Sequence, residues 1–285
     1  MMSVDFAFLD SGTGGIPYMN FLREKCPSAT CIYVADTKNF PYGQKSSEEI
    51  ISSVLSICQK IISKFNPNTI VIACNTMSVN ALDAVRKAFP GVNFVGTVPA
   101  IKLAASFSKK RRIGLLATNS TVNHPYNQKL KADFASDCTL ICRGDADLIS
   151  FIEHESFTAG KGQILAAVAP AVDFFRKEDC DVIILGCTHF LNIASEIQEV
   201  CGPSIKVVDS KEGVVNHALE LSGVLGAEPL GEGVADKTAA QRGLGSEGKA
   251  FPTPELFITG FTEKKDENEY DVICKRFGLV FKNII

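Results

Sequence analysis

The sequence predicts an α/β protein of two similar lobes with mostly parallel sheets, and a functional site in the cleft between the lobes. Three observations support this prediction. Short β-branched runs alternate with longer helical stretches, which is typical of parallel α/β folds. The runs are continuously apolar, as expected for strands that helices cover on both faces. A strand-to-helix turn with a cysteine occurs twice, within residues 69–80 and 181–192.

Nine short apolar runs are the predicted strands. In chain order they span residues 4–9, 30–34, 69–73, 92–96, 113–117, 139–142, 181–185, 205–208 and 256–259. Longer stretches between them have the apolar spacing of helices. The clearest predicted helices span residues 48–64, 79–89, 101–108, 164–177 and 194–200.

The repeated turn indicates two comparable half-sites. Residues 69–80 are TIVIACNTMSVN, and residues 181–192 are DVIILGCTHFLN. Each is a buried strand that ends in Cys, followed by a small polar residue and the start of a helix. Because the turns fall in different halves of the chain, we expect residues 1–97 and 208–285 to form the first lobe and residues 98–207 the second.

One segment differs in composition from the rest. Residues 226–250, GAEPLGEGVADKTAAQRGLGSEGKA, are rich in Gly, Ala and charged side chains and show no periodicity. We expect an exposed, mobile insertion before the strand at 256–259, with no part in the chemistry.

Composition excludes several classes of protein. A chain of 285 residues with 46% apolar and 21% charged residues fits an ordinary globular protein of about two domains. The net charge of −3 gives no basic surface for nucleic acid or for a membrane. The N-terminal run lacks the positive residues of a signal peptide, and no apolar run reaches a membrane-spanning length. We expect a cytoplasmic protein whose partner is a small molecule.

The 10 cysteines are scattered and form no CxxC pair. Most lie in apolar segments, where a free cysteine packs as a small hydrophobic side chain. A secreted disulfide scaffold is shorter and poorer in core residues. We therefore expect reduced thiols. Cys138 and Cys142 resemble half of a metal site, but no second pair matches them, so no metal is expected.

Four segments place reactive or polar groups directly after predicted strands. In open α/β sheets, ligands bind beyond the carboxyl ends of the strands. The four segments are DSGTGG at 10–15, CNT at 74–76, TNST at 118–121 and CTH at 187–189.

Cys74 and Cys187 are the candidate reactive groups. A thiol at a helix N-terminus lies at the positive end of the helix dipole, so we expect its pKa to fall below the usual value. The exposed amides there also suit a carboxylate ligand. Two cysteines packed without a chemical role are the alternative, but their matching turns favour a functional pair.

Two further residues could support these thiols. Asp10 could exchange protons with a thiol or bind an ammonium group, or it could simply cap the following turn. His189 lies two residues after Cys187 and could reach its sulfur; a structural histidine is the alternative. The GTGG stretch lacks the GxGxxG spacing of nucleotide sites, because Pro17 occupies the third glycine position.

Several motifs together resemble the glutamate racemases of the aspartate/glutamate racemase family. They are LDSGTGG at 9–15, ADTKNFPYG at 35–43, ACNT at 73–76, LATNST at 116–121 and LGCTH at 185–189. The match in order and spacing covers residues 5–210. It implies an enzyme that interconverts L-glutamate and D-glutamate without pyridoxal phosphate or another cofactor, and that supplies D-glutamate for peptidoglycan.

The resemblance also implies a role for each matching position. Cys74 and Cys187 would be the two catalytic bases, on opposite faces of the substrate α-carbon, with Asp10 supporting Cys74 and His189 supporting Cys187. Asp36 and Glu153 match two further carboxylates near the site. The positions that match substrate-binding residues are Asp10, Ser11, Tyr42, Gly43, Asn75, Thr76, Thr118, Thr121, Thr188 and His189.

The sequence departs from the family pattern outside the catalytic atoms. The departures are Met77 and Ser78 after CNT, Arg143 after Cys142, Phe190 and Leu191 after CTH, and the Gly-rich segment. We expect them to affect packing and the surface. The oligomeric state stays open, with a homodimer as one assembly.

Two other function classes compete with the racemase. A thiol hydrolase or transferase that uses Cys187 and His189 would leave the CNT turn without a purpose. A two-lobed binding protein for a small anion would explain the strand-end loops but not why both contain cysteine. Aspartate or another acidic amino acid is the nearest alternative substrate. His189 favours glutamate, because related aspartate racemases commonly have Cys-Thr-Glu.

Overall fold

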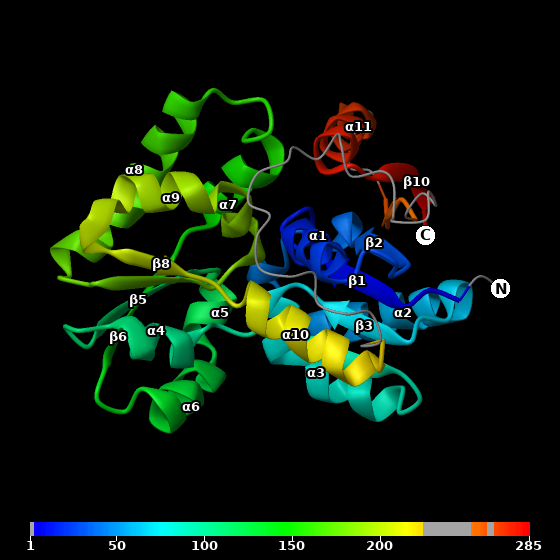
Figure 1. The fold of residues 1–285 in the computed structure, drawn as a ribbon, viewed down its shortest axis with the longest axis horizontal. Helices are drawn as coiled ribbons and strands as arrows, with labels where there is room; N and C mark the ends of the chain where they lie inside the picture. Colours follow the sequence, from blue (N-terminus) through cyan, green and yellow to red (C-terminus); the bar gives the residue numbers. More distant parts are fainter. Residues whose placement is uncertain (1–2, 225–251, 261–264) are drawn as a thin grey trace.

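The computed structural model describes residues 3–224, 252–260 and 265–285. These residues form two sheets, each flanked by helices, which lie side by side (Figure 1). Every strand pairing described is parallel. The predicted α/β class with two parallel lobes is confirmed. The predicted insertion at 226–250 lies outside the described residues.

The first sheet has six strands in the order β10-β9-β2-β1-β3-β4. Their bounds are β1 Phe6–Asp10, β2 Cys31–Ala35, β3 Thr69–Ile72, β4 Asn93–Gly96, β9 Glu255–Ile258 and β10 Val280–Ile284. Successive side chains of β1 enter opposite cores, with Phe6 and Phe8 on one face and Ala7 and Leu9 on the other. This burial on both faces is why the strand is apolar at every position.

The helices of the first lobe come from both ends of the chain. They are α1 Ile16–Lys25, α2 Ser47–Phe65, α3 Asn75–Ala88, α10 Lys211–Ser222 and α11 Lys265–Phe277, with the 3₁₀ helices η1 Thr37–Asn39 and η2 Tyr42–Gln44. α2 begins with a capping box: Glu49 N–H donates to the Ser46 hydroxyl at 3.3 Å, and Ser46 N–H donates to the Glu49 carboxylate at 2.9 Å.

The second sheet has four strands in the order β6-β5-β7-β8. Their bounds are β5 Arg112–Ala117, β6 Thr139–Gly144, β7 Val182–Leu185 and β8 Lys206–Val208. Helices cover both faces (Figure 1). The helices of one face are α7 Ala146–His154, α8 Lys161–Lys177 and α9 Ala194–Cys201, and those of the other are α4 Ile101–Phe107, α5 Asn119–Asn123 and α6 Pro125–Phe134; η3 Thr188–Ile193 and η4 Gly202–Ser204 are 3₁₀ helices.

The chain crosses between the sheets twice. It leaves the first sheet after β4 and returns after β8 through α10, which packs against α1. Val215 and Ala218 of α10 lie in the same core as Phe6 and Phe8 of β1. The expected limits near residues 97 and 208 lie at these crossings, and the division into two domains at those limits stays our proposal.

The sequence prediction missed the last strand. The strand predicted at 256–259 corresponds to β9, but β10 follows it and pairs with it at the edge of the sheet. Residues 280–284, VFKNI, mix apolar and polar side chains, because an edge strand is less completely covered than a central one. Within the described ranges, no helix combines the length and apolar composition that crossing a bilayer requires.

Candidate active site

The two cysteine turns come from different sheets and face one cavity. Cys74 follows β3 and Cys187 follows β7, each two residues after the strand ends. Both line a cavity of about 20 Å³, room for about one water molecule. The other lining residues are Ser11, Phe40, Pro41, Tyr42, Gly43, Asn75, Thr76, Thr118, Ile149 and His189. A larger ligand therefore requires the two lobes or the lining loops to move apart.

Cys74 is the N-cap residue of α3, at the position that the repeated turn predicts. Its side chain is buried, and its Sγ lies 3.9 Å from Oγ of Ser11. The expected decrease of its pKa is wrong. Burial and the charge of Asp10 raise the pKa of the Cys74 thiol well above its ordinary value, and they outweigh the N–H of Met77, which lowers it. Cys74 is therefore a thiol at neutral pH.

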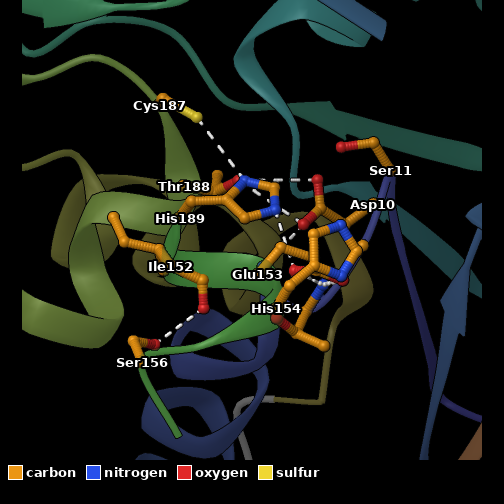
Figure 2. A network of polar contacts seen from close by, with 12 residues as sticks. Asp10, Ser11, Ile152, Glu153, His154, Ser156, Cys187, Thr188 and His189 are labelled. Carbon is orange, nitrogen blue, oxygen red and sulfur yellow. Dashed lines mark hydrogen bonds and ion pairs between the residues drawn. The ribbon is translucent and has the colours of Figure 1, made fainter. Parts of the chain in front are cut away.

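Cys187 begins a chain of three side chains, joined by two contacts, in the second lobe (Figure 2). It is the N-cap residue of η3, a 3₁₀ helix that precedes α9. Its Sγ lies 3.6 Å from Nδ1 of His189, and Nε2 of His189 lies 3.0 Å from Oε2 of Glu153 on α7. All three side chains are buried. The prediction that His189 reaches the Cys187 sulfur is confirmed by this geometry.

The His189–Glu153 contact is an ion pair. Burial alone would lower the pKa of His189, but the contacts with Cys187 and Glu153 raise it well above its ordinary value. Burial alone would raise the pKa of Glu153, but hydrogen bonds from His189 and Thr13 lower it. Each charge is stabilised by the other, so a buried imidazolium and a buried carboxylate coexist. A protonated His189 can donate Nδ1–H to the Cys187 sulfur.

Asp10 is the last residue of β1, and its side chain is fully buried. Its carboxylate accepts hydrogen bonds from Gly15 N–H at 2.8 Å and from the Tyr33 hydroxyl at 3.3 Å. The Thr188 hydroxyl lies 3.4 Å away (Figure 2). Burial raises the pKa of Asp10 to about 6, and the charge of His189 limits the increase. In the described part of the chain, Asp10 makes no hydrogen bond to Cys74 and acts on that thiol through its charge.

We expect Asp10 to titrate near pH 6, which makes the protein less stable as the pH rises. Its pKa of about 6 lies above the ordinary value of 3.8, so between these values the folded chain holds a proton that the unfolded chain has released. The contribution of Asp10 to the free energy of unfolding is complete below about pH 4 and is lost as the pH rises through about 6. The carboxyl ¹³C shift of Asp10 should give the pKa directly.

The Asp10→Asn variant provides the control for this titration. It should remove the ¹³C signal that titrates near pH 6, and it should lose less unfolding free energy than the wild type between pH 4 and 7. A signal that titrates near the ordinary value of 3.8 would contradict the expectation.

Asp36 does not touch either sulfur in the described structure. The Tyr42 hydroxyl donates to its carboxylate at 2.5 Å, the Thr259 hydroxyl at 2.6 Å, and the Asn39 amide at 3.0 Å. Tyr42 lines the cavity together with Cys74. Asp36 therefore fixes the position of the Tyr42 hydroxyl. The Tyr42 side chain lines the cavity, and Asp36 does not.

Polar side chains, one of them without an internal partner, also face the cavity. The buried amide of Asn75 has no hydrogen-bond partner for either Nδ2 or Oδ1 among the described residues. The hydroxyls of Thr76, Thr118 and Thr121 form a triangle, with separations of 2.9, 3.3 and 3.0 Å, that joins the lobes. Thr76 and Thr118 line the cavity, and Thr121 does not. Asn75 is thus available to a polar ligand.

The glycines of the DSGTGG loop allow the lobes to meet. A Cβ on Gly12 would lie 2.5 Å from Oε1 of Glu153, and one on Gly14 would lie 2.5 Å from the backbone nitrogen of His189. A Cβ on Gly43 would lie 2.9 Å from Cβ of Thr118. Close approach to the second lobe explains this glycine run better than binding of a nucleotide.

Sequence reasoning missed residues that act from other elements. Thr13 contacts Glu153, Tyr33 contacts Asp10, and Phe40, Pro41 and Ile149 line the cavity. Thr13 could have been noted as a polar side chain between glycines. Ile149 carries no sequence signal, because its place depends on how α7 packs. Among the described residues, no group of three or more His, Cys, Asp and Glu side chains has the arrangement of a metal site.

The comparisons with known proteins agree on one family. The family model described as Asp/Glu/Hydantoin racemase matches residues 20–218. A glutamate racemase of Treponema pallidum subsp. pallidum is 45% identical over 216 residues, which are 76% of this chain and 80% of the relative. One of Shewanella piezotolerans is 35% identical over 220 residues, 77% of this chain and 81% of the relative.

A solved structure extends the similarity to almost the whole fold. Escherichia coli glutamate racemase, in complex with L-glutamate and the activator UDP-MurNAc-ala, is 27% identical to this chain and superimposes with a TM-score of 0.79. The similarity covers 99% of this chain and 98% of that chain.

Proposed function

We propose a reaction for this chain on one premise: it belongs to the Asp/Glu/hydantoin racemase family and is an amino-acid racemase. The proposed reaction interconverts L-glutamate and D-glutamate by two-base proton transfer at Cα. One observation carries the proposal. Cys74 and Cys187, from opposite sheets, line the same narrow cavity.

Two bases are needed because racemisation removes a proton from one face of Cα and returns one to the other. In the L-to-D direction, the Cys187 thiolate takes the α-proton, and the electron pair of the C–H bond stays on Cα. The Cys74 thiol then donates its proton to the opposite face. The roles reverse for D-glutamate. The raised pKa of Cys74 supports the thiol form that this direction requires.

His189 and Glu153 support the Cys187 side of the reaction. A protonated His189, 3.6 Å from the sulfur, can donate a hydrogen bond to a thiolate. Glu153 stabilises the protonated form of His189, which keeps the Nδ1–H donor available to the sulfur. Asp10 is proposed to support the Cys74 side, where an ionised carboxylate can accept the thiol proton or bind the substrate ammonium.

The substrate carboxylates would be held by neutral donors. We assign the α-carboxylate to the unpartnered Asn75 amide, to Ser11 and to the hydroxyls of Thr76 and Thr188, which would offset the negative charge that develops beside Cα. The remaining proposed substrate contacts are Tyr42, Gly43, Thr118, Thr121 and His189. This scheme needs no pyridoxal phosphate and no metal.

Glutamate is favoured over aspartate by two observations. The relatives that cover most of this chain are named glutamate racemases, at 45% and 35% identity. His189 follows Thr188, where related aspartate racemases commonly have Glu. We further propose that the D-glutamate supplies peptidoglycan synthesis, supported by the muramic acid derivative that activates the Escherichia coli relative. A cytoplasmic homodimer is the proposed form of the enzyme.

The test is Cα exchange without added cofactor. The purified protein is incubated with L-glutamate or D-glutamate in D₂O, and chiral chromatography and ¹H NMR follow the loss of optical purity and of the α-proton signal. We expect both enantiomers to converge on the racemate and to gain α-deuterium, while aspartate reacts more slowly. Binding without exchange would indicate a binding protein, and hydrolysis of a thioester or amide without exchange would indicate a thiol hydrolase.

A further inference from the structure

Thr13 makes the most direct contact between the first lobe and the Cys187 side of the site. It lies in the loop after β1, and its side chain is fully buried. Its hydroxyl donates to Oε2 of Glu153 at 2.5 Å, and its backbone N–H lies 3.0 Å from Oε2 and 3.2 Å from Oε1. Glu153 belongs to α7 of the second lobe. One residue of the first lobe thus donates twice to a buried carboxylate of the other.

The oxygen that accepts the Thr13 hydroxyl is also the oxygen that contacts His189. Oε2 of Glu153 lies 3.0 Å from Nε2 of His189, whose other ring nitrogen faces the Cys187 sulfur. Tyr270 also approaches this carboxylate, at its other oxygen and at a longer distance of 3.5 Å. A change in the Thr13 donor therefore acts on the oxygen that orients the imidazolium.

We propose that Thr13 is a positioning residue for the reaction, which acts through Glu153 and His189 on Cys187. The inference rests on the proposed function and deepens it. Because Thr13 and Glu153 come from different lobes, their hydrogen bonds depend on the contact between the lobes. They support the Cys187 side of the site, while Cys74, Ser11 and Asp10 lie together in the first lobe. The two halves of the site depend differently on Thr13.

The tests use Thr13→Val and Thr13→Ser. Val has almost the same shape without the hydroxyl, and Ser keeps it. The readout is elimination of a leaving group from Cβ of a glutamate analogue, which needs a base on one face only. We expect Thr13→Val to slow elimination about tenfold for the enantiomer that Cys187 deprotonates and to change the other by less than about twofold. Thr13→Ser should retain wild-type rates for both.

The pH profile supplies a second readout. Because the Thr13 hydrogen bonds lower the pKa of Glu153, loss of the hydroxyl raises it. For the enantiomer that Cys187 deprotonates, the acid limb of the elimination rate against pH should therefore move to higher pH in Thr13→Val. In Thr13→Ser it should stay in place. Thr97→Val is the matched control, since Thr97 is buried and its hydroxyl has no partner among the described residues. It should leave both rates unchanged.

The outcomes separate this inference from the proposed function. An equal decrease of the elimination rate for both enantiomers in Thr13→Val, or wild-type rates for both, would overturn the role of Thr13. The proposed function would still hold if the wild type racemises glutamate. If Thr13→Val does not fold, reduced Cys187-side elimination in folded Thr13→Ser would overturn it as well. If the wild type does not racemise glutamate, the proposed function fails and the inference fails with it.

Discussion

Cys74→Ser and Cys187→Ser should each reduce racemisation of glutamate by about 1000-fold or more. A serine hydroxyl is a poor base at neutral pH, so each variant loses the proton carrier on one face of Cα. The loss should appear in both directions, because racemisation uses both faces whichever enantiomer is supplied. The measurement is the initial rate of optical change with each enantiomer.

Elimination from a β-substituted glutamate analogue should separate the two cysteines. This reaction needs one base, so each variant should keep activity towards one enantiomer. In the proposed reaction Cys187 takes the α-proton of L-glutamate, so we expect Cys74→Ser to eliminate from the L analogue and to fail with the D analogue. Cys187→Ser should show the opposite preference. Equal loss for both enantiomers in each variant would contradict the facial assignment.

Cys142→Ser is the matched control for these variants. Cys142 is half-buried on β6 and does not line the cavity, so its replacement should leave both reactions at the wild-type rate. A thiol hydrolase predicts another pattern, in which Cys74→Ser is nearly silent and Cys187→Ser is inactive with every substrate. A binding protein predicts no turnover in any variant.

The sequence predicted those parts of the fold that depend on local pattern. The strands that became β1 to β9 were found because each is short and apolar, and the cysteine turns were found because they repeat. The edge strand β10 was missed, since its mixed composition does not show burial on two faces. The matching motifs predicted that Asp10, Glu153 and His189 belong to one site. In the structure His189 contacts Glu153 at 3.0 Å, and Asp10 lies 3.4 Å from the hydroxyl of Thr188, the neighbour of His189.

The remaining features depend on tertiary contacts that a linear pattern does not contain. The helix N-terminus suggested a lowered pKa for Cys74, but burial and the charge of Asp10 raise this pKa. Neither the burial of Cys74 nor the proximity of Asp10 can be deduced from the CNT motif alone. Glu153 is 140 residues from Thr13, and no spacing rule joins them. The glycines of the loop were rejected as a nucleotide motif, and their purpose became clear only from the side chains opposite them.

Gly14→Ala should lower kcat/KM for glutamate about 100-fold or more while the protein stays folded. A Cβ on Gly14 would lie 2.5 Å from the backbone nitrogen of His189 and 2.7 Å from Oγ1 of Thr188, both in the second lobe. A backbone atom cannot rotate away, so the lobes must shift apart at the point where the two bases face Cα. A misplacement of about 1 Å at reacting groups costs about 100-fold in rate. Steady-state rates and thermal melting measure the two effects.

Two other glycines make the prediction specific. A Cβ on Gly15 would meet Cβ of Ala73 at 2.7 Å and the Tyr33 hydroxyl at 2.9 Å, both within the first lobe, so Gly15→Ala should lower the melting temperature as well as the rate. Gly162 lies in α8 with open space around its missing Cβ, and Gly162→Ala should preserve activity and slightly stabilise the helix. Gly14→Ala alone should combine near-normal melting with lost turnover, because its methyl group obstructs the meeting of the lobes and not the folding of either one. Wild-type turnover in Gly14→Ala would mean that the reacting enzyme holds its lobes further apart at this loop than the structure does.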